Sequence, residues 1–413
     1  MFFIYNLIVL IAIILFFPFI FFHKNLKKGI RERFAFYQKE IKKKFKNKKI
    51  VWLHASSVGE VNVANVLIKR LRKNLNDYCF IITTMTVTGK EQAIRSKLYD
   101  YVTFVPFDFI FFVYRFLKIF NPKIVVVIET EFWPNLFYCV NKMKIPLIVA
   151  NCRISLKSFE HYYKFKFFFT HVLNLASLYI CQNNETAERL NNIGVNKEKI
   201  LISGNMKFDV EFEKFNEEEI KKEFFIDKNK FILCAGSTHA PEEEIISDLV
   251  EKLENSLIII APRHLERLNE IKEIFEKKNI SYRLLSEKKL KNEKILLIDK
   301  YGVLIKAYAI SDVCFIGGSI AIIGGHNPLE AIYFKKPIIS GRNIFNFYDI
   351  YMELENLKGV IFVKDGNEFY EKVKLLKENP NLRKKIGENA YKIFEKNKGT
   401  CDFTIKQIVK FLN

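Results

Sequence analysis

The chain has 413 residues, 49% hydrophobic and 27% charged, which excludes a wholly disordered protein and suggests two or three domains of roughly 100–200 residues each. Its 66 Lys and Arg against 46 Asp and Glu give a net charge of +20, which favours an anionic partner: nucleic acid, anionic lipid or a phosphorylated substrate. Part of this positive charge can also be explained by the composition alone, because Lys, Ile, Phe and Asn are abundant along the whole chain. Seven cysteines, an odd number without a C-x-x-C pair, predict reduced thiols in a cytosolic body.

The N-terminal segment 2–22 carries no charged side chain and is long enough to cross about 30 Å of hydrocarbon. A signal peptide fits poorly, because no basic region precedes this segment and no small-residue cleavage site follows it. Residues 23–50 contain 12 Lys and Arg against two Glu, a net +10 that places the body on the cytoplasmic side and could bind anionic head groups. We therefore predict a membrane anchor over 1–22. A helix lying in the bilayer surface and a buried helix with a basic linker are the alternatives.

After residue 49, short β-branched runs alternate with helical patterns. The runs are nearly continuous in apolar residues, which is typical of parallel strands buried on both faces. In the first half the predicted strands are 51–58, 79–85, 123–129, 146–151, 178–182 and 199–203. In the second half they are 231–237, 257–263, 295–299, 312–319 and 337–340. The charged stretch 211–230 is the predicted linker between the halves.

This alternation predicts an α/β fold with two Rossmann-like, doubly wound domains facing a cleft, preceded by the anchor. We set the domains at 23–215 and 216–413, and the last helix could pack back on the first domain. Ligands of such sheets bind at the carboxyl ends of strands. Residues at strand ends and helix starts are therefore the candidates for chemistry.

Three charged residues in the first half meet this condition. Glu60 follows the first strand in SSVGE and opens a helix, where it could act as a general base or simply favour the helix start. Glu129 ends a buried strand in ETEFWPN, so it needs a partner, or it caps the turn. Lys207 in GNMKFD could neutralise a carboxylate or phosphate, or remain solvated.

The second half offers loops suited to a nucleotide. The stretch 235–239 is a small-residue loop of the kind that holds phosphates with backbone N–H groups. Arg263, directly after Pro262, could hold a phosphodiester. Two glycine-rich stretches, 317–319 and 324–330, precede a helix, and Glu330 there could accept hydrogen bonds from ribose hydroxyls.

Several common sites are absent from the sequence. His239 with Glu243, and His326 with Glu330, have helix spacing but no third ligand nearby, so we predict no metal site. The P-loop, the G-x-G-x-x-G fingerprint and the G-x-S-x-G elbow do not occur. No nucleic-acid-binding module accompanies the positive charge, so we expect no nucleic-acid partner.

Eight stretches together resemble one family. In order, they are HASSVGE, TTMTVTG, IETEFWPN, ANCRIS, GNMKFD, AGSTHAPEEE, PRHLER and GGSIAIIGGHNPLEA. They resemble the 3-deoxy-D-manno-octulosonic acid (Kdo) transferases of lipid A and lipopolysaccharide core biosynthesis. The resemblance implies a membrane-anchored GT-B type glycosyltransferase at the cytoplasmic face of the inner membrane. It would move one or more Kdo residues from CMP-Kdo to a lipid A precursor, lipid IVA, by an inverting single displacement without a metal or other cofactor.

The resemblance also assigns roles to matching residues. Glu60 corresponds to the proton acceptor, and Glu129 and Lys207 to groups that stabilise the transition state. Domain 23–215 would bind the acceptor and domain 216–413 the CMP-sugar. The matching CMP-binding residues are Pro262, Arg263, Tyr301, Gly302, Val303, Asn327, Pro328, Leu329 and Glu330.

The chain departs from the family pattern at three places. Val303 stands where the family has a glutamate, Ala35 where it has a glycine and Arg342 where it has a proline. The first departure removes one side-chain contact to the donor. Two other functions are kept as alternatives: a GT-B enzyme with another donor such as a UDP-sugar, and a non-enzymatic protein that binds the membrane surface through its basic flank.

Overall fold

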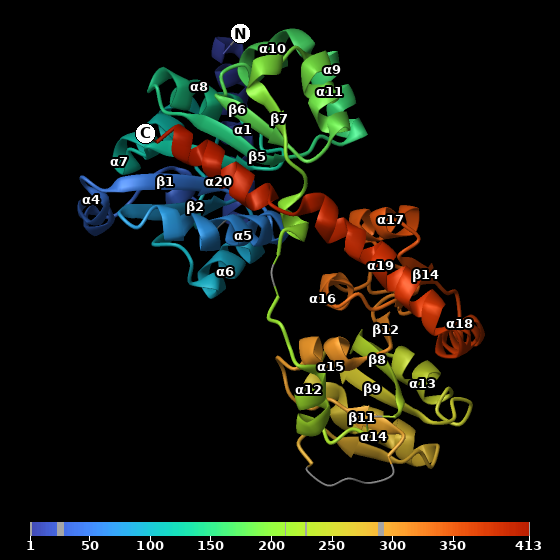
Figure 1. Cartoon of the computed structure of the whole chain (residues 1–413). Helices are drawn as coiled ribbons and strands as arrows, with labels where there is room; N and C mark the ends of the chain where they lie inside the picture. The colour runs from blue at the N-terminus through green and yellow to red at the C-terminus, as the bar shows by residue number, and fades with distance from the viewer. Residues whose placement is uncertain (1, 23–28, 211, 228, 288–292, 413) are drawn as a thin grey trace. The chain divides into compact units, whose positions relative to one another are not determined.

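The computed structural model describes residues 2–22, 29–210, 212–227, 229–287 and 293–412 (Figure 1). The chain forms two compact units: unit 1 comprises Met1–Val210 and Asn397–Asn413, and unit 2 comprises Glu211–Lys396. The end of the chain thus belongs to unit 1; our domain limits counted it with 216–413, with the expectation that the last helix could pack back on the first domain. Three lysines of the predicted basic flank, Lys24, Lys27 and Lys28, lie outside the described residues.

The sheet of unit 1 has seven parallel strands in the order β3-β2-β1-β4-β5-β6-β7. The strands are β1 Lys49–His54, β2 Tyr78–Thr84, β3 Tyr101–Phe104, β4 Ile124–Ile128, β5 Leu147–Cys152, β6 Leu178–Cys181 and β7 Ile200–Ile202. The strand order reverses between β1 and β4, which are neighbours. Ligands of doubly wound sheets bind at such a switch point, beyond the carboxyl ends of the two strands.

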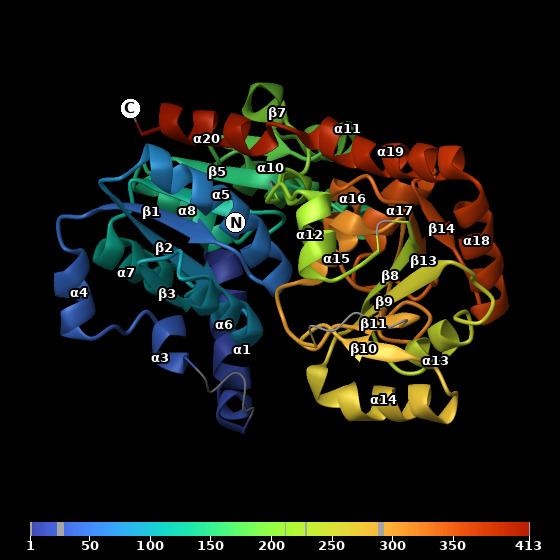
Figure 2. The same ribbon diagram turned by 60° about the horizontal axis from the view of Figure 1, so that its bottom comes forward.

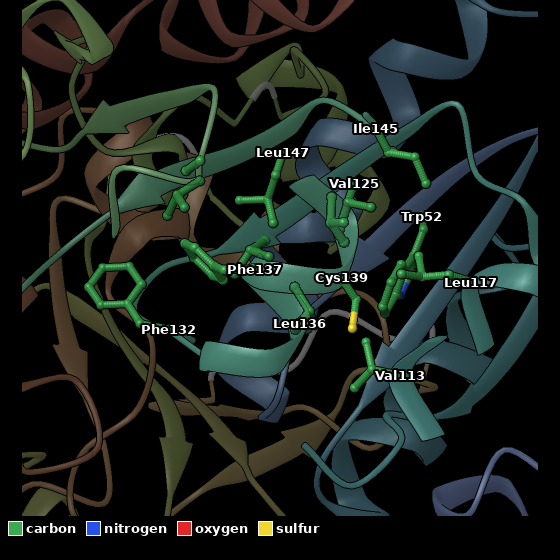
Figure 3. Close-up of a cluster of buried hydrophobic side chains, with 14 of the residues drawn as sticks. Trp52, Val113, Leu117, Val125, Phe132, Leu136, Phe137, Cys139, Ile145 and Leu147 are labelled. Atoms are coloured by element: carbon green, nitrogen blue, oxygen red, sulfur yellow. The ribbon is translucent and has the colours of Figure 1, made fainter. Parts of the chain in front are cut away.

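Helices cover both faces of this sheet. They are α1 Phe2–Phe22, α3 Ile30–Arg33, α4 Lys39–Phe45, α5 Val58–Asn74, α6 Val87–Ser96, α7 Ile110–Phe120, α8 Pro134–Lys142, α9 Leu156–Lys164, α10 Lys166–Leu173, α11 Asn184–Ile193 and α20 Thr400–Lys410, with the 3₁₀ turns η1 Lys197–Lys199 and η2 Met206–Phe208. One face packs on α7 and α8, where Trp52 and Val125 of the sheet meet Leu117 and Phe137 (Figure 3). The other face packs on α5 and α20.

The last helix, α20, is tied to unit 1 by polar contacts as well as by its apolar side. The carboxylate of Asp209 accepts a hydrogen bond from the Cys401 N–H at 2.7 Å, and Arg70 on α5 lies 3.4 Å from the same carboxylate. The buried side chains of Cys401 and Ile408 join the core against α5. These contacts place the segment after Asn397 on unit 1.

Unit 2 has a second seven-stranded parallel sheet, in the order β10-β11-β9-β8-β12-β13-β14. Its strands are β8 Phe231–Thr238, β9 Ser256–Pro262, β10 Tyr282–Leu284, β11 Ile295–Leu297, β12 Val313–Ile316, β13 Ile338–Ser340 and β14 Val360–Phe362. In Figure 2, β8, β9, β11 and β10 follow one another across this sheet. The order reverses between β8 and β12, so this pair is the switch point of unit 2.

The helices of unit 2 are α12 Glu217–Glu223, α13 Glu242–Ser247, α14 Leu268–Lys277, α15 Leu304–Ile310, α16 Leu329–Tyr333, α17 Tyr348–Asn356, α18 Gly366–Glu378 and α19 Pro380–Asn397, with the 3₁₀ turn η3 Leu265–Arg267. Ile246 of α13, Ile271 of α14 and Phe369 of α18 pack in one cluster on one face of the sheet. The predicted linker 211–230 was wrong in part, because it contains α12. That helix buries Ile220, and its Glu223 pairs with Lys306 at 2.8 Å.

Three strands, β3, β10 and β14, have no counterpart among the predicted strands. All three lie at sheet edges and are only partly buried. Thr103 in β3 and Arg283 in β10 interrupt the apolar run that indicates a parallel strand. The short run of β14 is continuous in apolar residues, and the sequence prediction missed it.

Helix α1 packs on unit 1 through its first turns. The Tyr5 hydroxyl donates to Asp108 at 2.8 Å, and the side-chain amides of Asn6 and Asn135 bond each other at 2.9 and 3.1 Å. Phe2 lies against Tyr138 with ring centroids 4.5 Å apart. Within the described residues, no helix meets the length and hydropathy needed to cross a membrane, so the predicted spanning anchor is not supported.

Candidate active site

Glu60 lies at the switch point of unit 1, in the first turn of α5. Ser57 is the N-cap of this helix, and the spacing Ser57 to Glu60 matches a capping box. The carboxylate accepts hydrogen bonds from the Ser56 N–H at 2.6 Å and from the Ser57 hydroxyl at 3.1 Å. Glu60 therefore supports the start of the helix, and the same bonds fix the carboxylate at the carboxyl end of β1.

The surroundings of Glu60 make it a stronger base than a solvated glutamate. Burial first, then the negative charge of Glu131 and to a smaller extent that of Glu129, raise the pKa of Glu60 to about 7. The hydrogen bond from Ser56 and the ring of His54 oppose this rise. A carboxylate with a pKa near the working pH is suited to general-base catalysis.

Glu129 and Lys207 form an ion pair beside this group. The Lys207 Nζ lies 2.9 Å from Oε1 of Glu129, and the Glu129 side chain is 16% exposed. Glu129 directly follows β4 and has a φ of 63°, a left-handed conformation that is costly for a residue with a Cβ. The neighbouring strand end has the same feature at Asn151, with a φ of 54°. Strained backbone at two adjacent strand ends is common in functional sites.

The fold fixes the backbone around Lys207 from several directions. Lys207 lies in the 3₁₀ turn η2, whose N-cap Asn205 accepts from the Lys207 N–H at 3.0 Å. The Asn205 N–H donates to the Asn397 side chain at 2.7 Å, and the Met206 N–H donates to Asn151 at 2.9 Å. The lysine side chain can therefore reach Glu129 from a rigid turn.

Two further residues of this site, His54 and Glu131, had no role in the sequence prediction. The ring of His54 is fully buried, with Nδ1 2.9 Å from Thr83 Oγ1 and Nε2 3.7 Å from Glu131. Burial favours a raised pKa for Glu131, but hydrogen bonds from His54, Ser56 and Trp133 outweigh it and lower that pKa. The position of His54 at the end of β1, as the first residue of the stretch HASSVGE, was a sequence signal that could have indicated it.

Unit 2 has a cavity of about 490 Å³ at the carboxyl edge of its sheet, within the size range of small-molecule sites. Six of the nine predicted nucleotide-binding residues line it: Pro262, Arg263, Tyr301, Gly302, Asn327 and Glu330. Burial raises the pKa of Glu330. Arg263 is an exposed residue, and its side chain has no ion pair among the described residues.

The other three predicted residues do not line the cavity. Val303 is the N-cap of α15, Pro328 is the N-cap of α16, and Leu329 is buried in α16. Asn327 accepts from the Leu329 N–H at 3.1 Å, so these two residues help to hold the loop in place. Tyr301 is 64% exposed at the cavity rim. The departure at Val303 therefore falls at the start of a helix, outside the cavity lining.

In the loop 235–239, predicted to hold phosphate with backbone N–H groups, the N–H of His239 is bound by a side chain of the protein, together with the N–H groups that follow β12. The carboxylate of Glu242 accepts from the N–H groups of His239, Gly318, Ser319, Ile320 and Ala321 at 2.8 to 3.2 Å. Glu242 is fully buried, and this burial raises its pKa against the effect of those bonds. Glu242 thus takes the His239 donor and joins the ends of β8 and β12, and the phosphate role of the rest of 235–239 stays a prediction.

Metal-ligating residues do not gather elsewhere. In the part of the chain that the structure describes, no three His, Cys, Asp or Glu side chains come close enough to hold a metal ion. His239 and His326 lie next to each other, but Glu243 is engaged by Arg267 at 2.8 Å.

The two units define the class of fold. Each is a Rossmann-like parallel sheet, one with a nucleotide-sized cavity and one with a cluster of carboxylates, and two such units make up the GT-B type of fold. MurG from Acinetobacter baumannii has this fold, with a TM-score of 0.53 at 11% identity over 88% of this chain and 99% of that one.

Sequence comparison identifies the family within this class. The 3-deoxy-D-manno-octulosonic-acid transferase (kdotransferase) family matches residues 28–210. The 3-deoxy-D-manno-octulosonic acid transferase of Haemophilus influenzae is 34% identical over 378 residues, 88% of this chain and 87% of that protein. The chain belongs to the Kdo transferase family and is a glycosyltransferase.

A further relative is longer than this chain. A bifunctional glycosyltransferase/methyltransferase of Fusobacterium nucleatum is 34% identical over 409 residues, which cover 95% of this chain and 61% of that protein. The chain thus spans less than two thirds of the length of that relative.

Proposed function

We propose that this glycosyltransferase transfers Kdo from CMP-Kdo to a lipid A precursor, lipid IVA, by an inverting single displacement. The observation that carries the mechanism is the partly buried carboxylate of Glu60, whose pKa is raised to about 7 at the switch point of unit 1. The names of relatives such as the Haemophilus influenzae transferase support the choice of sugar.

In this mechanism, Glu60 accepts the proton of the acceptor hydroxyl as that oxygen attacks the anomeric carbon of Kdo. One carbon–oxygen bond forms while the bond between the anomeric carbon and the phosphate oxygen breaks, and CMP leaves with that electron pair. A single in-line displacement inverts the anomeric centre. The ammonium of Lys207, oriented by Glu129, stabilises negative charge that develops during the transfer.

The cavity of unit 2 supports a nucleotide donor. Arg263 is free to hold the phosphodiester of CMP-Kdo, and the half-buried Glu330 can accept hydrogen bonds from the ribose hydroxyls. The scheme uses no metal ion or other cofactor. Nucleic acid is not part of it, and the positive charge of the chain serves the phosphates of donor and acceptor and an anionic membrane surface.

We further propose that the protein works at the cytoplasmic face of the inner membrane, with α1 lying in the bilayer surface. The side of α1 opposite Tyr5 and Asn6 leaves apolar side chains in solvent, among them Phe3 at 80% and Leu15 at 65% exposure. Exposed Phe, Leu and Ile side chains on one side of a helix leave the water when they are buried at the boundary between headgroups and acyl chains. Contact with the membrane would bring the enzyme to an acceptor whose acyl chains are in the bilayer.

The reaction is tested by incubating the full chain with a tetraacylated lipid A precursor and CMP-Kdo generated in situ, followed by mass spectrometry. We expect a mass gain of one or more Kdo units, inhibited by CMP and unaffected by UMP. No gain with CMP binding intact would overturn the acceptor. Inhibition by UMP in place of CMP would instead favour a UDP-sugar donor.

Membrane contact is tested by flotation with vesicles that contain anionic lipid. Replacing Ile8 and Ile11 together by lysine should abolish flotation and leave nucleotide binding intact, because both side chains lie on the exposed side of α1. Ile94→Lys is the matched control, since Ile94 is equally apolar and 55% exposed on α6. Flotation of the double variant at the wild-type level would contradict the proposal.

A further inference from the structure

Two histidines share a hydrogen bond at the switch point of unit 2. His239 directly follows β8, and His326 belongs to the glycine-rich loop before α16. Their Nε2 atoms are 2.9 Å apart, and their ring planes differ by 7°. Such a bond needs a proton on one Nε2 and a lone pair on the other. The two rings therefore have opposite tautomers and hold one proton between these nitrogens.

The fold forces the rings together. The carboxylate of Glu242 bonds the backbone N–H of both His239 and Gly318, and the Tyr351 hydroxyl donates to the His326 carbonyl at 3.3 Å. A Cβ at Gly318 would lie 3.1 Å from Nε2 of His326, so the glycine lets the ring lie close against the loop. His326 also lines the cavity together with Arg263, whereas His239 supports it from behind.

The charges around the pair are mostly positive. Arg263, Arg267 and the ring of His264 surround it, and His264 lies edge-on to His239 with centroids 5.5 Å apart. Of the acids nearby, Glu242 is bonded to backbone N–H groups and Glu243 is bound to Arg267 through both oxygens. Glu330 and Lys300 line the same cavity.

These surroundings keep the pair neutral near pH 7. Burial first, then His239, Arg263 and His264, lower the pKa of His326 to about 4. Burial first, then His264, lower the pKa of His239, against the opposing charge of Glu243. A phosphate placed beside Arg263 would reverse the sign of the local field, since an opposite charge at close range raises the pKa of a histidine.

We propose that the His239–His326 pair takes up one proton from solvent when the donor phosphodiester binds, and that His326 then donates a hydrogen bond to that phosphate. The second proton occupies the Nε2 that had accepted, so the bond between the rings breaks and the Nε2–H of His326 is released to the cavity. His326 is thus a donor-binding residue and His239 a positioning residue. This inference rests on the proposed function, because it takes the cavity to be the CMP-sugar site.

Proton uptake has a definite sign in the affinity. With a low pKa in the free protein and a higher one in the complex, binding takes up a proton at pH values between the two. Affinity therefore falls as the pH rises through that window, by up to about tenfold per pH unit for one linked proton. Below the lower pKa the rings are already protonated and the dependence disappears.

The test is titration calorimetry of the full chain with the methyl ester of CMP, a phosphodiester that keeps a single charge between about pH 5 and 8. Paired buffers of different ionisation enthalpy report the protons taken up per ligand bound. We expect uptake approaching one proton and an affinity that weakens with pH. His326→Gln should abolish both, and its unfolding temperature should be followed alongside to establish that it folds.

Two controls separate other sources of protons. His161→Gln, an exposed ring in unit 1, should leave uptake and affinity unchanged. Glu330→Gln removes the carboxylate that lines the cavity and should retain the uptake, whatever its affinity. In the wild-type protein with ¹⁵N-labelled histidine, the ligand should move the Nε2 resonances of His239 and His326 to the protonated position, and this readout needs no variant.

The outcomes distinguish the two proposals. Tight binding with no proton uptake at any pH would overturn the histidine pair and leave the donor site intact. Uptake that persists in His326→Gln, or disappears in Glu330→Gln, would also overturn it. Failure of the ester to bind at any pH would refute the donor site of the proposed function, and the inference with it.

Discussion

Replacing Glu60 by glutamine is expected to lower the rate of sugar transfer by about 10²–10⁴-fold, the usual contribution of a positioned general base. Glutamine keeps the size of the side chain and can still accept from the Ser56 N–H, so α5 should start at the same residue. Nucleotide binding, which we assign to unit 2, should not change. The measurement is single-turnover transfer with saturating donor, together with the affinity for CMP.

The pH dependence supplies a second readout for Glu60. Only the ionised carboxylate can accept a proton, and its pKa is raised to about 7. The rate should therefore fall as the pH drops through about 7, rather than near the ordinary value for glutamate of about 4.3. Glu91→Gln, at an exposed position of α6, is the matched control and should keep both rate and profile. Near-normal turnover of Glu60→Gln would refute the base assignment.

Breaking the ion pair between Glu129 and Lys207 is expected to have the second large effect. Lys207→Met should lower the rate by about 10²-fold or more, as removal of a transition-state-stabilising group does. It should also move the acid limb of the pH profile to higher pH. With its cation removed, the charge of Glu129 acts in full on Glu60, whose pKa that charge already raises.

Removing the negative partner, Glu129, should move the acid limb of the pH profile to lower pH. Glu129→Gln removes a negative charge near Glu60, so Glu60 should ionise at lower pH while the rate still falls. Lys69→Met, an exposed lysine of α5, controls for the loss of a positive charge. If both variants shifted the limb alike, or neither shifted it, the electrostatic coupling of these groups would be wrong.

Some of the candidate site residues could be predicted from the sequence by their position after a strand. Glu60, Glu129 and Arg263 follow apolar runs that are buried strands, and the sequence indicates such runs because β1, β4 and β9 are covered on both faces. Position after a strand then fixes the edge of the sheet. Which strands are neighbours at that edge follows only from the sheet order, in which β1 lies beside β4 and β8 beside β12.

The partners of these residues could not be predicted from local patterns. Glu242 reads as one of three glutamates at a helix start, yet it is the carboxylate that fills the loop after β12, 76 residues further along the chain. His239 and His326 are 87 residues apart and share one proton. The pairing of His54 with Glu131 likewise arises from tertiary packing and has no local sequence pattern.

The sequence by itself determined the class of fold, the central strands and the edge on which the chemistry lies, because burial on both faces imposes an unbroken apolar run and the residue after it must lie at the sheet edge. It did not determine the short edge strands β3, β10 and β14. Only the tertiary structure decided which charges meet. Ion pairs and shared protons depend on distances of 3 to 4 Å between side chains, and packing alone brings segments so far apart in the chain to that separation.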